Sequence, residues 1–95
     1  MELKVSSNTL VINGNIKSIS DFQNIKRSID NIIIAHKHIN INIEDSLSIT
    51  SSVIGYLNKL VLKDSIDLHM SIGNEQLLRL LDDLNLASTF KAKRN

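Results

Sequence analysis

Two segments of the chain alternate strictly between apolar and polar residues, and this pattern constrains the fold more than any other feature. Ile39, Ile41 and Ile43 alternate with asparagine, and the segment Ile66–Ile72 follows the same period of two. Successive side chains of a strand point to opposite faces of its sheet, so this period buries one face only. We therefore expect two strands in a sheet whose helices all pack on one side.

A helical period precedes the first of these strands. From Asp21 onward, apolar residues recur three and four positions apart, which predicts an amphipathic helix. Ser20 is the expected N-cap, and Gln23, three residues later, could complete a capping box.

Two further helices are expected, one between the alternating strands and one after them. The buried stripe of the former is predicted to be Val53, Ile54, Leu57, Leu60 and Val61. The latter follows Gly73 and has Asn74 as its expected N-cap. Its inward-facing residues are predicted to be Leu77, Leu78, Leu81 and Leu84.

Short strands complete the predicted order β-β-α-β-α-β-α-β. They are expected at Leu3–Val5, Thr9–Asn13 and Thr89–Lys93. Strands joined through helices favour parallel neighbours, whereas the N-terminal hairpin is antiparallel, so the sheet should be mixed. Residues 1–95 are thus expected to form a single α/β domain with about three helices on one face of a mixed sheet.

The composition narrows the possible functions. The chain has no cysteine, which excludes disulfides and thiolate zinc sites. Its net charge is +1 and its basic residues are scattered, so the sequence offers no electrostatic footprint for nucleic acid. Its apolar runs are too short to cross a membrane, and its first residues lack a signal-peptide pattern. A cytoplasmic protein without direct membrane insertion is the expectation.

The transition from strand to helix at residues 49–55, ITSSVIG, is the main candidate for function. Thr50, Ser51 and Ser52 open the second predicted helix, where backbone N–H groups lack partners and the helix dipole is positive. Hydroxyls at this position can cap the helix, or they can display a serine whose phosphorylation acts as a signal.

Length, element order and this motif together resemble the STAS domain family, which includes the bacterial anti-sigma factor antagonists. In that family the motif reads roughly apolar-Asp-Ser-Ser-Gly-Leu-Gly, and its first serine is phosphorylated. Here Thr50 replaces the aspartate and Val53 the first glycine. The resemblance makes Ser51 the candidate phosphorylation site. It also implies a partner-binding segment of Thr50, Ser51, Ser52, Val53, Ile54 and Gly55.

The same resemblance implies a small signalling protein that binds a serine kinase or anti-sigma factor, with Ser51 as a possible switch. An alternative is a STAS-like accessory subunit of a membrane lipid-transport ATPase complex, which docks on its ATPase without a phosphorylation cycle. In either case the chain itself needs no cofactor. Gly55, expected inside the helix, would then be explained by the close approach of a neighbouring element or of the partner.

The remaining candidate groups indicate no enzyme and no metal site. His36 and His38 are spaced for one strand face, but no third ligand is evident and Lys37 lies between them, so His36 is interpreted as complementing a helix dipole. His69 alone on a polar strand face is weak evidence for a ligand. Glu44-Asp45 is expected to be a solvated turn, and no nucleophile elbow or phosphate loop is present.

Overall fold

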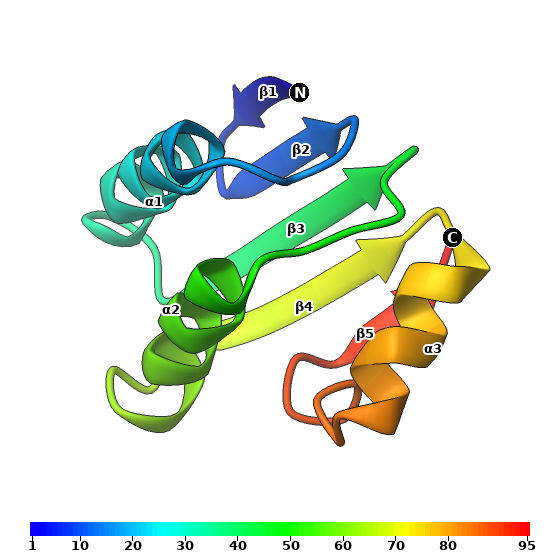
Figure 1. The fold of residues 1–95 in the computed structure, drawn as a ribbon. Coiled ribbons are helices and arrows are strands. Elements are labelled where there is room, and N and C mark those ends of the chain that lie inside the picture. Colours follow the sequence, from blue (N-terminus) through cyan, green and yellow to red (C-terminus); the bar gives the residue numbers. More distant parts are fainter.

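The computed structural model describes residues 1–95 and contains the predicted succession of elements (Figure 1). The strands and helices are β1 (Glu2–Ser6), β2 (Thr9–Asn13), α1 (Ile19–Ile33), β3 (His38–Glu44), α2 (Ser51–Leu62), β4 (Asp67–Ile72), α3 (Glu75–Asp83) and β5 (Ala92–Arg94). None of the helices is both long and apolar enough to cross a membrane.

The five strands form one mixed sheet, and their order in space is their order in the chain, β1-β2-β3-β4-β5. β1 is antiparallel to β2, whereas β2, β3, β4 and β5 are parallel to one another. The prediction of a mixed sheet is therefore confirmed, and the Ile39–Ile43 strand lies in its interior. In the parallel register, His38 lies opposite Asp67 and Ile41 lies opposite Met70.

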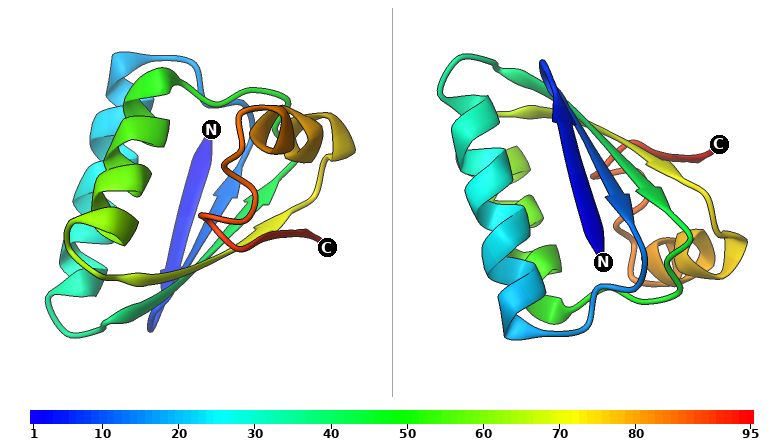
Figure 2. Two further views of the ribbon diagram at one scale, coloured as in Figure 1. Left: turned by 90° about the horizontal axis from the view of Figure 1, so that it is seen from below. Right: turned by 90° about the horizontal axis from the view of Figure 1, so that it is seen from above.

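All three helices lie on one face of the twisted sheet, as the alternation predicts (Figure 2). α1 and α2 lie side by side, and α3 covers the end of the sheet formed by β4 and β5. This follows from the strand order, because right-handed crossovers that always advance in one direction leave every helix on the same side. The opposite face carries no helix.

One apolar core fills the space between the helices and the sheet. Most of the apolar residues predicted to face the core are buried, including Ile39, Ile41, Ile43, Leu57, Leu68, Met70 and Leu81. Ile54, Val61 and Leu78, which were also predicted to face inward, are only half-buried and pack against this core. Tyr56 and Phe90 also belong to this core, although the sequence analysis did not place them there. On the helix-free face the strands present mainly polar residues, such as Asn40 and Asn42, that are half-buried.

The start of α1 differs from the prediction. The N-cap is Ser18 rather than Ser20, and the capping box is completed by Asp21 rather than Gln23. The Ser18 hydroxyl accepts the Asp21 N–H at 3.0 Å, and the Asp21 carboxylate accepts the Ser18 N–H at 3.2 Å. Ile19, the first helical residue, is 78% exposed. The apolar periodicity therefore begins after the first helical residues. For this reason the N-cap predicted from it, Ser20, lies two residues too late in the chain.

The C-terminal segment differs as well. The last strand was predicted at Thr89–Lys93, but β5 spans only Ala92–Arg94. Phe90 lies in a helical turn, where its N–H donates to the carbonyl oxygen of Leu86, and its side chain enters the core. Leu84 was predicted to face inward, but it terminates α3 and is half exposed.

Candidate functional site

The loop between β3 and α2 is fastened to the segment that follows β2. The buried Ser46 hydroxyl donates to the Ser48 carbonyl oxygen at 2.9 Å, and the Ser48 hydroxyl donates to the Ile16 carbonyl oxygen at 3.1 Å. The Leu47 N–H donates to the Asn15 side-chain oxygen at 2.8 Å. These contacts fix the approach of the chain to the first turn of α2.

In the first turn of α2, the helix is capped by Thr50 and not by Ser51. The N-cap is Thr50, whose Oγ1 accepts the Val53 N–H at 3.3 Å. Ser51 is the first helical residue and its side chain is exposed, as is that of Ser52. The predicted position of Ser51, accessible and within one residue of the N-cap, is confirmed. Because Thr50 supplies the cap, the Ser51 hydroxyl is not needed for it.

The six predicted partner-binding residues do not all reach the surface. Val53 is only 1% exposed and packs in the core, so its side chain cannot contact a partner. Thr50 and Ile54 are half-buried, whereas Gly55 is exposed. A Cβ atom built on Gly55 would meet nothing within 4 Å. The expected approach of a neighbouring element to Gly55 is therefore not found within the chain.

Exposed residues recur at helical spacing along α2 and form a continuous stripe. This stripe, called here the outer face of α2, consists of Ser51, Ser52, Gly55, Lys59 and Leu62. Leu62 is 72% exposed at its C-terminal end. The outer face thus combines hydroxyls at the helix N-terminus, a position without a side chain, and an exposed apolar residue.

A polar contact joins α2 to α1 beside this face. The buried Tyr56 hydroxyl donates to Asp30, which also accepts from Lys26 at 2.8 Å. Burial alone would raise the pKa of Asp30, but the hydrogen bonds from Lys26 and Tyr56 outweigh it and lower that pKa. Burial, together with the same hydrogen bond to Asp30, raises the pKa of the Tyr56 hydroxyl. Tyr56 therefore stays protonated and acts as a structural donor.

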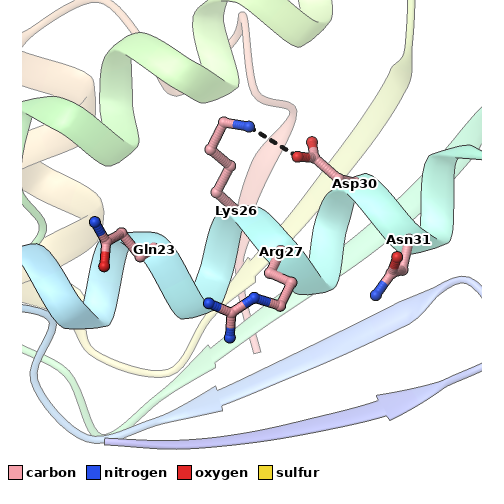
Figure 3. A pocket seen from close by; sticks show the side chains of 5 residues that line it. All are labelled: Gln23, Lys26, Arg27, Asp30 and Asn31. Atoms are coloured by element: carbon pink, nitrogen blue, oxygen red, sulfur yellow. Dashed lines mark hydrogen bonds and ion pairs between the residues drawn. The ribbon is translucent and has the colours of Figure 1, made fainter.

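The outward side of α1 carries a shallow depression, and Figure 3 shows the side chains that line it. In that view Lys26 and Asp30, joined by their ion pair, extend on the side of α1 that faces α2. The lining has no apolar side chain, whereas small-molecule pockets are lined mainly by apolar ones. The lining residues are Gln23, Lys26, Arg27, Asp30 and Asn31.

The helix-free face of the sheet holds a cluster that the sequence analysis missed. His38 opens β3, Asp67 opens β4, and His69 follows two residues later on the same strand face. His38 Nδ1 lies 2.9 Å from Asp67 Oδ2, and His69 Nε2 lies 3.2 Å from Asp67 Oδ1. His69 is therefore not a lone histidine. His36, by contrast, precedes β3 and is not part of that strand.

Lys91 is the fourth member of this cluster. Its Nζ lies 2.8 Å from Asp67 Oδ1. The Lys91 ammonium, and next the hydrogen bond with His38, hold the pKa of Asp67 well below its usual range, so the carboxylate is ionised near neutral pH. A sequence signal for the cluster does exist. It is a histidine at the start of one strand and an Asp-x-His pair at the start of its parallel neighbour.

Comparison with known proteins supports the fold and leaves the function open. No family model and no curated protein matches the chain. The NMR structure of the protein TM1081 is similar, with a TM-score of 0.67 and 19% sequence identity. The similarity covers 98% of this chain and 79% of that one. At this identity the similarity shows a shared α/β fold only.

Proposed function

We propose that this protein is a STAS-like signalling module of the cytoplasm that resembles an anti-sigma factor antagonist and binds a serine kinase or anti-sigma factor. The binding surface is the outer face of α2 with the adjoining loop, and Ser51 is the phosphoacceptor. The chain supplies no catalytic group to this process. The nucleotide belongs to the partner kinase.

One observation carries this proposal, namely that Thr50 caps α2 while Ser51 is exposed beside it. Capping was the competing explanation for a serine at this position, and a cap is worth about 0.5–2 kcal/mol. Because Thr50 makes that hydrogen bond, the side chain of Ser51 is available to a partner.

The position of Ser51 also determines what a phosphate would do there. A phosphoserine adds about −1.5 to −2 charges near neutral pH. The first turn of α2 contains no acidic residue, so the positive end of its dipole has no carboxylate beside it. The fold should therefore tolerate the modification. A partner docked on the outer face of α2 would instead have to accommodate a dianion in place of a hydroxyl, and would dissociate.

A second candidate function is the accessory subunit of a lipid-transport ATPase complex. Two departures from the motif favour it, because Thr50 is the helix cap and Val53 is a core residue. Both therefore stabilise the start of α2 and supply no charge that would position a kinase. In this role the outer face of α2 would dock constitutively on the ATPase subunit.

In the decisive experiment the protein is incubated with ATP and with any serine kinase that a neighbouring gene encodes, and its intact mass is measured. Wild type and Ser52→Ala should gain one phosphate, whereas Ser51→Ala should gain none. Ser51→Asp should keep the wild-type circular dichroism spectrum and bind the kinase at least about tenfold more weakly, a change of about 1.4 kcal/mol.

Two results would reject the switch. One is the absence of phosphate on wild type, and the other is equal kinase affinity for Ser51→Asp and wild type. Neighbouring genes for transporter components, with constitutive co-purification of their ATPase, would then favour the second candidate. Ser52→Ala is the matched control, because Ser52 is the adjacent exposed serine on the same turn.

A further inference from the structure

The cluster on the helix-free face is separate from the proposed docking surface. His38 and Asp67 are the first residues of parallel neighbouring strands, so they lie at the N-terminal edge of the sheet. Ser51 follows the opposite, C-terminal end of β3, on the side that the helices cover. Neither the capping of α2 nor the phosphoacceptor proposal uses His38, Asp67 or His69. Their convergence therefore needs its own explanation.

The side chains of the cluster converge on a small volume. One ligand atom from each of His38, Asp67 and His69 can be chosen so that all three lie within 4.8 Å of one another. The two imidazole rings have centroids 4.8 Å apart and are tilted by 49°. All three side chains are partly exposed. A solvated ion can therefore reach the cluster, and small rotations of the side chains cost little.

The distances suit a tetrahedral ion of the zinc class. Zinc binds imidazole nitrogen and carboxylate oxygen at about 2.0–2.2 Å, which places neighbouring ligand atoms roughly 3.3–3.5 Å apart. His38 Nδ1 and His69 Nε2 lie 2.9 and 3.2 Å from the two different oxygens of Asp67, close to that spacing. With one atom from each residue the separations reach up to 4.8 Å, so small side-chain rotations must bring one Asp67 oxygen and both imidazoles onto the ion. Two imidazoles and one carboxylate are also a donor set that selects zinc, nickel or copper over magnesium and calcium, which prefer oxygen ligands.

We propose that His38, Asp67 and His69 bind one divalent transition-metal ion of the zinc class at the N-terminal edge of β3 and β4. Each residue supplies one ligand, and solvent completes the coordination. The ion cross-links two strands whose sequence positions are separated by the whole of α2.

Lys91 opposes this binding. Its ammonium lies 2.8 Å from the Asp67 oxygen that also faces His69. A metal ion and this ammonium cannot both occupy that position, because two cations would repel at such a distance. Lys91 is itself half exposed and can move into solvent. The proposal therefore requires the ion to displace Lys91, and removal of the Lys91 charge should strengthen metal binding.

The test is a titration of tag-free protein with Zn²⁺ by isothermal calorimetry, repeated with Co²⁺ so that the absorption spectrum reports the ligands. Wild type should bind one equivalent of each metal and no Mg²⁺. His69→Ala and Asp67→Asn should lose at least about tenfold in affinity. His36→Ala is the matched control and should bind like wild type. Lys91→Met should bind more tightly.

Any of three results would overturn the proposal. Wild type that takes up no Zn²⁺ would exclude the site, and cluster variants that bind like wild type would place the ion elsewhere. Equal losses in His36→Ala and His69→Ala would point to non-specific imidazole binding. Circular dichroism of each variant tests whether it is folded. Because these side chains are partly exposed, replacing them should leave the fold intact, so that a loss of metal binding reports a lost ligand.

Discussion

Gly55→Ala should stabilise the free protein, and the structure allows the size of the effect to be worked out. Gly55 lies inside α2, its backbone is not in the left-handed region, and an added Cβ would meet no atom within 4 Å. The added methyl group thus causes no clash and buries little surface. What remains is the helix propensity, which favours alanine over glycine by about 0.8–1 kcal/mol in a helix interior. Where the gain comes chiefly from the reduced conformational entropy of the unfolded chain, it can be as low as about 0.4 kcal/mol.

This gain translates into a measurable shift of the thermal midpoint. For a domain of this size, 1 kcal/mol corresponds to about 4–8 °C, so we expect an increase of about 2–8 °C. Urea denaturation should show a higher midpoint with an unchanged slope, because the surface exposed on unfolding stays nearly the same. Both measurements require only the purified chain.

Gly14→Ala is the control of opposite sign. Gly14 has φ of +100°, and a Cβ built there would lie 3.2 Å from the Met1 Cα atom. A side chain in this conformation is strained, so this variant should lose stability. If Gly55→Ala left the midpoint unchanged or lowered it, the assignment of Gly55 to an open helix surface would be refuted.

Three further outcomes follow from the core and from the cap of α1. Ile41 is 1% exposed, so Ile41→Ala should lower the free energy of unfolding in urea by about 2–5 kcal/mol, and a loss below about 1 kcal/mol would contradict its burial. Ser18→Ala should lose about 0.5–2 kcal/mol in the same assay while Ser20→Ala changes little, and the reverse order would restore the cap predicted from sequence. The pKa of Asp21 is lowered, chiefly by the hydrogen bond from the Lys17 backbone N–H. Because its folded pKa lies below its unfolded value of about 3.9, its contribution is complete above that value and is lost as the pH falls through the folded pKa. Thermal midpoints of Asp21→Asn should accordingly fall less than those of wild type between pH 5 and pH 2, and parallel curves would refute the linkage.

The sequence predicts the sheet well because its signal is local and periodic. The alternation of Ile39, Ile41 and Ile43 specifies one buried face, and a register shift of one residue would expose all three. The same periodicity fails at the ends of elements. Ser18 was missed because Ile19 is mostly exposed and does not join the buried apolar stripe, and Phe90 was missed because it enters the core from a turn, where no period exists.

The two candidate sites differed in predictability for a related reason. Ser51 belongs to one contiguous motif, so its place at the start of α2 could be inferred from neighbouring residues alone. The group of His38, Asp67 and His69 forms only when two strands adopt a particular register, and an isolated histidine gives no indication of its cross-strand partner. Reading each polar strand residue together with its parallel neighbour would have revealed it.

The agreement between spatial and chain order of the strands has a consequence for how the protein is made. Every strand after the first pairs with the one synthesised just before it, so each contact between neighbouring strands closes only a hairpin or one β-α-β unit. Such a topology keeps the sequence separation of contacts short for a parallel sheet, which favours rapid folding. The sheet can therefore form from β1 towards β5 while the chain emerges from the ribosome. Until β5 is synthesised, the unpaired edge of β4 is the segment most open to pairing with another nascent chain.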